Sequence, residues 1–323
     1  METVNVLFIL DKWCAGIESS GISEWETNIW KSLETTGFAN IRTFHYDEYS
    51  QRSGKQGDSA LLLQCTQEKP DLICIVIYKR PGSDNTVPTI EALNTLNYTM
   101  EIPVVAIWGD LQSKALCSVA DEIVPFTNLN IYTALYDGSK NVVCSDTFMY
   151  TWVPKDQLVF RDFAFVRDIP LTYIGSSRPF REDMIKFLKD NEINIYRTGG
   201  EREKHISTLE YAKLLNRSQI NLSFSRAGVP PVHVINARVF ETMLCGAMLL
   251  EQESDEMLRF YEPFVDYVPY QHPMDMVDKI KYYLLHQEER LKIAKSGCVK
   301  TVQKYNAKLF WQNIFIKLNM WEE

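Results

Sequence analysis

Short apolar runs, each followed by polar or small residues, limit the folds open to this chain more than any other feature. VNVLFIL at 4–10, DLICIVIY at 71–78 and PVVAIW at 103–108 are continuous apolar segments of strand length. Such runs are typical of parallel strands that are buried on both faces. A helical segment is expected at 87–100 and a further strand at 122–125. This alternation predicts an α/β protein with mostly parallel, doubly wound sheets.

The alternation begins again after an irregular stretch between residues 149 and 170. LTYI at 171–174 predicts a new strand, and Ser207 with Glu210 three residues later forms a capping box that predicts the start of a helix. A chain of 323 residues is long enough for two domains that each bury a core. The predicted domains are an N-terminal one at 1–168 and a C-terminal one at 169–305, followed by a terminal segment at 306–323.

Composition excludes several classes of protein. The net charge of −8 and the absence of long Lys/Arg runs argue against a nucleic-acid groove. The seven cysteines are scattered without a CxxC pair, which favours reduced thiols in a cytosolic protein. The first ten residues are too short and too quickly polar for a signal peptide. No apolar run approaches the roughly 20 residues of a membrane helix. We therefore expect a soluble cytoplasmic protein without a transmembrane segment.

A first candidate site lies in the stretch 220–250, which predicts a strand, a Pro-rich loop, a helix from about Ala237 and a second strand. Arg238 and Glu241 are three residues apart and so share a face of that helix. Ligands of open α/β sheets bind at the carboxyl ends of the strands, which is where this helix begins. Arg226, in the loop after the first strand, is assigned to the same ligand. The alternative for Arg238 and Glu241 is a simple salt bridge within the helix.

A second candidate site is the turn after the strand at 171–174. Backbone N–H groups of Gly175 and Ser176, at a helix N-terminus, can hold a phosphate. Arg178 and Arg181 add positive charge that complements a diphosphate. The alternative is an ordinary turn that carries solvated arginines.

Candidates for acid–base chemistry are few. Asp11 and Asp110 each follow a strand, and either could act as a general base on an acceptor hydroxyl, although loop aspartates are also common caps and turn formers. His233 is the only histidine in a promising loop. Metal-ligand spacing, a GxSxG elbow, a GxGxxG turn and a Walker loop are all absent from the sequence. Metal sites, hydrolases, dehydrogenases and P-loop enzymes are therefore disfavoured.

Several strings of the C-terminal half match a known family. They are LLNRSQINLSFS, the R-x-F-E of Arg238 to Glu241, CGAMLLEQ and DYVPYQHPMDMVDKIKYYLLHQEERLKIAKSG. The run from Ala212 to Gly297 resembles glycosyltransferases of the spore-maturation CgeB type, which are related to the group-1 glycosyltransferases. The resemblance is looser over the N-terminal half.

The resemblance implies a GT-B fold, with two Rossmann-like domains facing across a cleft and a C-terminal helix at 306–323 that crosses back to the N-terminal domain. The N-terminal domain would take the acceptor and the C-terminal domain a nucleotide-sugar donor. Glu241 would then bind the donor ribose, and Arg238, Arg181 and the backbone of Gly175 and Ser176 would face the diphosphate. Such enzymes generally need no metal, and no cofactor is expected.

The resemblance also has a departure. Retaining relatives carry a glutamate where this chain has His233, so the stereochemical outcome is open, and an inverting reaction would need a base such as Asp110 or Asp11. The predicted function is transfer of a sugar from a nucleotide-diphosphate sugar to a hydroxyl of a glycan, lipid-linked or protein acceptor. The alternatives are a nucleotide-sugar epimerase of the same architecture and a sugar-nucleotide-binding protein without catalysis.

Overall fold

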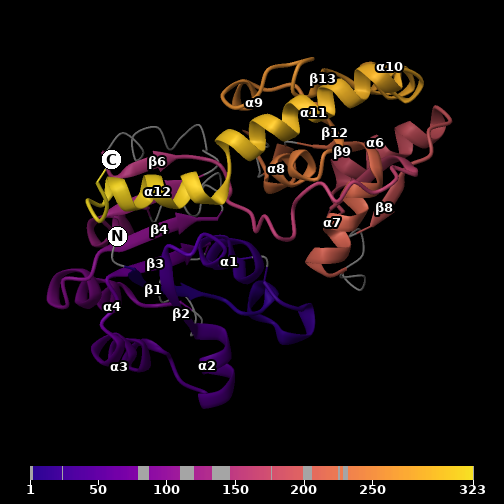
Figure 1. Ribbon diagram of the computed structural model, residues 1–323. Helices are drawn as coiled ribbons and strands as arrows, with labels where there is room; N and C mark the ends of the chain where they lie inside the picture. Colours follow the sequence, from indigo (N-terminus) through magenta and orange to yellow (C-terminus); the bar gives the residue numbers. More distant parts are fainter. Residues whose placement is uncertain are drawn as a thin grey trace. The chain divides into compact units, whose positions relative to one another are not determined.

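The computed structural model describes residues 3–23, 25–78, 87–109, 120–132, 146–175, 177–198, 206–224, 226–227 and 232–322. The chain divides into two compact units (Figure 1). Unit 1 comprises Met1–Asp156, Ala227–Val234 and Ala307–Glu323, and unit 2 comprises Gln157–Arg226 and Ile235–Asn306. The boundary expected after residue 168 therefore falls inside unit 2, because the irregular stretch from Gln157 onward belongs with the C-terminal elements.

Unit 1 contains a six-stranded parallel sheet with the order β2-β1-β3-β4-β5-β6. Its strands are β1 (Val4–Leu10), β2 (Ala39–His45), β3 (Leu72–Ile77), β4 (Val104–Trp108), β5 (Leu129–Tyr132) and β6 (Phe148–Tyr150). Every residue of β3 and β4 is buried, as expected for central strands that helices cover on both faces. The apolar runs therefore predicted these strands correctly.

The strand expected at 122–125 is wrong. The chain there is helical and ends in a 3-10 turn, η5 (Val124–Phe126), and the next strand is β5. Pro125 explains the difference, because proline lacks the N–H that a sheet ladder needs but fits the first turn of a helix.

Helices lie on both faces of the unit 1 sheet, and two apolar cores separate them from it. The helical segments are η1 (Cys14–Gly16), η2 (Glu18–Ser20), η3 (Glu26–Trp30), α1 (Lys31–Glu34), α2 (Tyr46–Ser53), α3 (Asp58–Glu68), α4 (Ile90–Asn94), η4 (Thr95–Thr99) and α12 (Ala307–Lys317). Although α12 is last in the sequence, it belongs to unit 1 (Figure 1). Trp311 is fully buried there, donates a hydrogen bond from Nε1 to Ser32 Oγ at 2.9 Å and packs edge-on against Phe8 at 5.7 Å.

Unit 2 contains a five-stranded parallel sheet with the order β13-β12-β9-β7-β8. A separate two-stranded pair, β10-β11, is not part of that sheet, and β11 falls in a segment of unit 1. The strands of the five-stranded sheet are β7 (Ile169–Ile174), β8 (Tyr196–Thr198), β9 (Ser218–Ser223), β12 (Met248–Gln252) and β13 (Val268–Tyr270), and the separate pair is β10 (Arg226–Ala227) and β11 (Val232–His233). The helices are α6 (Pro179–Asp190), α7 (Thr208–Arg217), α8 (Ala237–Leu244), α9 (Asp255–Leu258), α10 (Pro273–Leu285) and α11 (Gln287–Lys304). The two units thus share the parallel α/β architecture that the sequence predicts.

Side-chain alternation in these strands assigns the helices to faces. Leu171 and Tyr173 of β7, with Met248 and Leu250 of β12, share a core with α6 and α10. Ile174 instead shares a core with α7 and α8. Residues that alternate with the first set therefore point toward α7 and α8.

Local signals set the helix ends. Ser207 caps α7 by accepting a hydrogen bond from the backbone N–H of Glu210 at 3.2 Å, as the capping box predicts. Pro179 occupies the first turn of α6, and Arg178 is the residue before that turn. Among the helices of the described part of the chain, none is long and apolar enough to cross a membrane.

Candidate functional site

The carboxyl edge of the unit 2 sheet gathers most of the candidate side chains. Strands β7, β9 and β12 run parallel and end at this edge, followed by Gly175, Phe224 and Glu253 respectively. The N-termini of α6 and α8 follow strands β7 and β9 in the chain. Open parallel sheets bind their ligands at this edge.

Gly175 lies against the guanidinium group of Arg238. A Cβ atom added at Gly175 would meet Tyr173 Oη at 3.0 Å and Arg238 Cζ at 3.1 Å, and Arg238 Nη2 would be closer still. The guanidinium carbon also lies 5.5 Å from the centre of the Tyr173 ring. The absence of a side chain at Gly175 lets the guanidinium group approach the backbone this closely.

Arg178, Arg181 and Arg238, which we call the arginine corner, act on one another electrostatically at this edge of the sheet. Burial lowers the pKa of the Arg181 guanidinium, the Tyr173 side chain raises it, and the positive charges of Arg238 and Arg178 lower it further. Mutual repulsion of this kind disappears when an anion binds between the cations. The geometry therefore suits an anionic ligand, and the binding of a diphosphate by Arg178, Arg181 and Gly175 stays a prediction.

Arg238 remains charged despite its surroundings. Burial lowers the pKa of Arg238. Electrostatic interactions outweigh this effect and raise the pKa, and they come from Tyr211, Tyr173, Glu241 and Glu251. Its Nε atom is buried and has no hydrogen-bond partner among the described residues. A buried donor without a partner is rare in folded proteins and indicates a position where a ligand or water completes the bonding.

Glu241, on α8 like Arg238, is 5% exposed and accepts a hydrogen bond from Tyr211 Oη at 2.6 Å. Burial and the neighbouring Glu241 charge raise the pKa of Tyr211 well above its usual value, so the phenol stays protonated and keeps donating. Tyr211 was not identified from the sequence, because it stands among the core-facing residues of an amphipathic helix and no motif marks it.

Glu251, near the end of β12, was also not identified from the sequence. Its side chain is 0% exposed, and its Oε1 accepts a hydrogen bond from the backbone N–H of Gln252 at 2.9 Å. Burial raises the pKa of this carboxyl to about 7, against the opposing effects of Ser223, Arg238 and Arg181. The corner thus holds a titratable acid next to the arginines.

The remaining candidates are placed as follows. Asp110 and Ser176 lie outside the described residues, and so does the side chain of Arg226, whose backbone forms part of β10. His233 is half-buried in β11. Asp11 directly follows β1 in unit 1 and is 2% exposed.

The loop after β1 is hydrogen-bonded to Asp47, a residue that the sequence analysis did not single out. Asp47, which is fully buried, accepts hydrogen bonds from the backbone N–H groups of Lys12 at 3.0 Å and Trp13 at 2.8 Å. Asp11 stays a predicted base, next to a loop whose shape Asp47 fixes.

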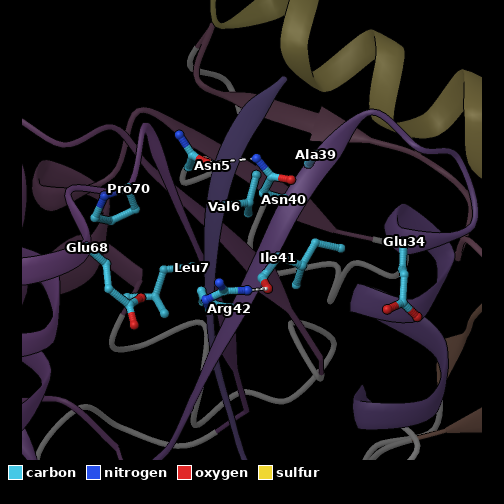
Figure 2. Close-up of a pocket in the computed structure, with 10 residues that line it drawn as sticks. All are labelled: Asn5, Val6, Leu7, Glu34, Ala39, Asn40, Ile41, Arg42, Glu68 and Pro70. Atoms are coloured by element: carbon cyan, nitrogen blue, oxygen red, sulfur yellow. Dashed lines mark hydrogen bonds between the residues drawn. The ribbon is translucent and has the colours of Figure 1, made fainter. Parts of the chain in front are cut away.

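Unit 1 has a cavity of about 670 Å³ that none of the predicted site residues in the described part of the chain lines (Figure 2). It is lined at the start of β1 and β2 by Asn5 and Asn40, which are register partners and hydrogen-bonded to each other at 3.1 Å. Asn5 is further bound to Asp71, at 2.9 Å from its side-chain amide. The amino ends of parallel strands are opposite the edge that binds ligands, so we do not assign the reaction to this cavity.

Comparison with known families identifies the domain that carries the arginine corner. Residues 178–315 match the model of a family described as glycosyl transferase-like. This segment is similar to a glycosyl transferase-like domain. It includes Arg178, Arg181, Arg238, Glu241 and Glu251, whereas Gly175 lies just before it. No curated protein sequence matches the chain.

Solved structures share the architecture of the whole chain. HepE of Anabaena in complex with UDP and glucose has a TM-score of 0.61 at 12% identity, over 98% of this chain and 100% of HepE. An alpha-glucosyltransferase in complex with UDP-glucose and abasic DNA has a TM-score of 0.65 at 11% identity, over 98% and 100%. A structure described as a UDP-N-acetylglucosamine 2-epimerase of Listeria monocytogenes has a TM-score of 0.56 at 11% identity, over 99% and 98%. The chain therefore has the GT-B fold, while the CgeB-like subtype stays a prediction.

Proposed function

We propose that this chain is a glycosyltransferase that moves a sugar from a nucleotide-diphosphate sugar to an acceptor hydroxyl without the help of a metal ion. The observation that carries the proposal is the close contact of Arg238 with Gly175, together with the positive charges of Arg238 and Arg178 that act on Arg181, in or next to the segment that matches the glycosyl transferase-like family. Transfer leaves a nucleoside diphosphate, whose developing negative charge needs positive groups held in place beforehand.

Each side chain of the corner has a role in this proposal. Arg238 and Arg181 would hold the diphosphate, and their fixed charges would take the place that a divalent cation has in metal-dependent transferases. Glu241, held by Tyr211, would accept a hydrogen bond from a ribose hydroxyl. Chelation with EDTA should therefore leave the transfer rate unchanged, and restoration of lost activity by Mg²⁺ or Mn²⁺ would contradict metal independence.

The nucleotide is proposed by analogy. HepE was solved with UDP and the alpha-glucosyltransferase with UDP-glucose, so uridine nucleotides are the first probes. We expect millimolar UDP, tested beside GDP, ADP and dTDP, to raise the melting temperature of the protein, since a ligand bound only to the native state stabilises it. Failure of all four nucleotides to do so would contradict the proposed function.

Variants connect the binding to the corner. Arg238→Ala and Glu241→Gln should weaken or remove the nucleotide-induced shift while the protein stays folded, and Glu241→Gln keeps an oxygen that can accept from Tyr211. Lys186→Ala is the matched control for charge, because Lys186 is exposed on α6 and lies outside the corner. If Lys186→Ala reduced the nucleotide-induced rise in melting temperature as much as Arg238→Ala does, the effect would come from the net charge of the protein and not from the arginine corner.

Product analysis separates transfer from its rivals. The fold likeness to a UDP-N-acetylglucosamine 2-epimerase makes epimerisation the second candidate. An epimerised donor in the absence of acceptor would favour that reaction, and binding without any turnover of donor would favour a sugar-nucleotide-binding protein. A new glycoside with an acceptor from a panel of glycans, lipid-linked sugars and proteins would establish transfer.

The acceptor side is proposed in outline. Asp11 and Asp110 are the base candidates if the configuration at the anomeric carbon inverts, and neither is needed if it is retained. The anomeric configuration of the product, measured by NMR, decides between these outcomes. For an inverting enzyme, Asp11→Asn should lower kcat with little change in KM for the donor. The net charge of −8 argues against a nucleic-acid acceptor.

A further inference from the structure

Glu251 occupies a position that the proposed reaction does not use. In the sheet it pairs with Ser223 of the neighbouring strand β9. It alternates with Met248 and Leu250, which face α6 and α10, so its side chain points toward α8. Helix α8 packs on both β9 and β12 and carries Arg238 in its first turn. The carboxyl group is therefore enclosed beneath the arginine corner.

The hydrogen bonds around Glu251 are incomplete. Its Oε2 atom is buried and has no hydrogen-bond partner among the described residues. The Asn236 Oδ1 atom, on a side chain whose amide lies 3.4 Å from Ser223 Oγ, is in the same condition, and so is Arg238 Nε. A buried carboxylate with an unpaired oxygen is costly in its charged form, so the protein favours protonation of Glu251.

Charged and titratable groups face Glu251 from several elements. Arg238 of α8 and Arg181 of α6 favour the carboxylate, and Ser223 of β9 donates to it. Tyr267, before β13, responds to Glu251 and Glu253, and burial together with these acids raises its pKa to about 12. The two cations that stabilise the carboxylate are the ones assigned to the diphosphate. Glu251 and a bound diphosphate therefore compete for the same positive charge.

We propose that donor binding is coupled to the uptake of one proton from solvent by Glu251, which makes Glu251 a positioning residue that acts through Arg181 and Arg238. The inference rests on the proposed function. In the free protein the Glu251 carboxylate interacts electrostatically with the guanidinium groups of Arg181 and Arg238. When a diphosphate arrives, its negative charge disfavours a second anion, the carboxylate becomes a neutral acid, and both arginines turn to the ligand. No bond of the donor changes in this step.

The coupling has a defined sign. Because the free carboxyl titrates at about pH 7, it is largely ionised in alkaline solution and must gain a proton for the donor to bind. Donor affinity should therefore fall as the pH rises through this range, and it should be nearly constant below it. Replacement of Glu251 by the neutral isostere glutamine should make donor binding independent of this proton.

The test is isothermal titration calorimetry with UDP-glucose, whose diphosphate bridge carries the same charge throughout the range used. For the wild type we expect the affinity to be roughly tenfold lower at about pH 9 than at about pH 7. For Glu251→Gln we expect a flat profile with tight binding at alkaline pH. The matched control is Glu253→Gln, which removes an exposed acid two residues further along and should keep the wild-type profile.

A second measurement needs no variant and covers the case in which Glu251→Gln does not fold. Titration of the wild type in two buffers of different ionisation enthalpy gives the number of protons taken up per donor. We expect most of one proton at about pH 8 and close to none at about pH 6. Equal affinity at every pH, or no proton uptake, would overturn the role of Glu251 and leave the proposed function intact. Absence of binding at every pH, for UDP-glucose and for the GDP, ADP and dTDP sugars, would contradict the proposed function itself.

Discussion

Gly175 controls where the guanidinium group of Arg238 can lie, and this gives a sharp prediction at the level of single residues. In Gly175→Ala the new Cβ would overlap that group, which is the end of a flexible side chain and can move without shifting the backbone. We therefore expect little loss of stability. Donor affinity should fall by at least about tenfold, or roughly 1.4 kcal/mol, because Arg238 would leave the position in which we propose that it binds the diphosphate. Thermal denaturation and calorimetric titration measure the two effects separately.

A double variant provides the control for Gly175→Ala. If the alanine acts by displacing Arg238, then Gly175→Ala combined with Arg238→Ala should bind the donor no more weakly than Arg238→Ala alone. Fully additive losses would show that the glycine acts on the ligand by another route.

The stability of the protein should depend on pH through Glu251. Its pKa rises from 4.5 to about 7 on folding, so the folded state binds the proton more tightly than the unfolded state does. This stabilisation is present below about pH 4.5 and is lost as the pH rises to about 7, at a cost of up to about 3 kcal/mol in alkaline solution. Urea denaturation should therefore find Glu251→Gln more stable than the wild type at about pH 8 and similar to it at about pH 4. A variant that is equally destabilised at both pH values would contradict this account.

The residues of the corner were unequally visible in the sequence. Gly175, Arg181 and Arg238 could be proposed because a strand followed by glycine and an Arg-bearing helix is a local pattern with a known use. Glu251 could not, because MLLEQ has the composition of a buried strand and nothing local shows that its acid faces two arginines from other elements. Tyr211 likewise acquires its role only when α7 packs beside α8.

Helix α12 should be essential to unit 1, which is a prediction at the level of elements. Trp311 fills the core between this helix and β1, contacts Phe8 and bonds to Ser32, although these residues are far apart in sequence. Trp311→Ala should destabilise unit 1 by about 4 kcal/mol, as expected for removal of a large buried aromatic side chain. Asn313→Ala, on the exposed side of the same helix, should change stability by less than about 0.5 kcal/mol. Equal effects in chemical denaturation would mean that α12 does not belong to the core.

The elements that the sequence predicted well are those with one dominant signal. Strands β3 and β4 are continuous apolar runs, and α7 begins at a capping box, so local physics decides them. The expected strand at 122–125 failed because Pro125 suits a helical turn better than a ladder. Helix α2 was not expected, because its sequence YDEYSQRS lacks a clear apolar face.

At the scale of the whole molecule, the distribution of tryptophan separates the two units. All seven tryptophans lie in the segments of unit 1, namely Trp13, Trp25, Trp30, Trp108, Trp152, Trp311 and Trp321. Each unit also has apolar cores of its own. Intrinsic tryptophan fluorescence therefore follows the unfolding of unit 1, whereas circular dichroism and calorimetry follow both units.

This distribution predicts a difference between probes when the donor is added. The proposed donor site is built from residues of unit 2, so a nucleotide sugar at about one hundred times its Kd should stabilise unit 2 by about 2.7 kcal/mol and raise its transition by roughly 8 °C. The tryptophan transition should stay where it is, because the ligand adds nothing to the unit 1 core. If fluorescence and calorimetry instead shift together by the same amount, the units unfold as one cooperative body, and the stability of the donor corner cannot be assigned to unit 2 alone. Arg238→Ala should remove the calorimetric shift in either case, which ties the effect to the arginine corner.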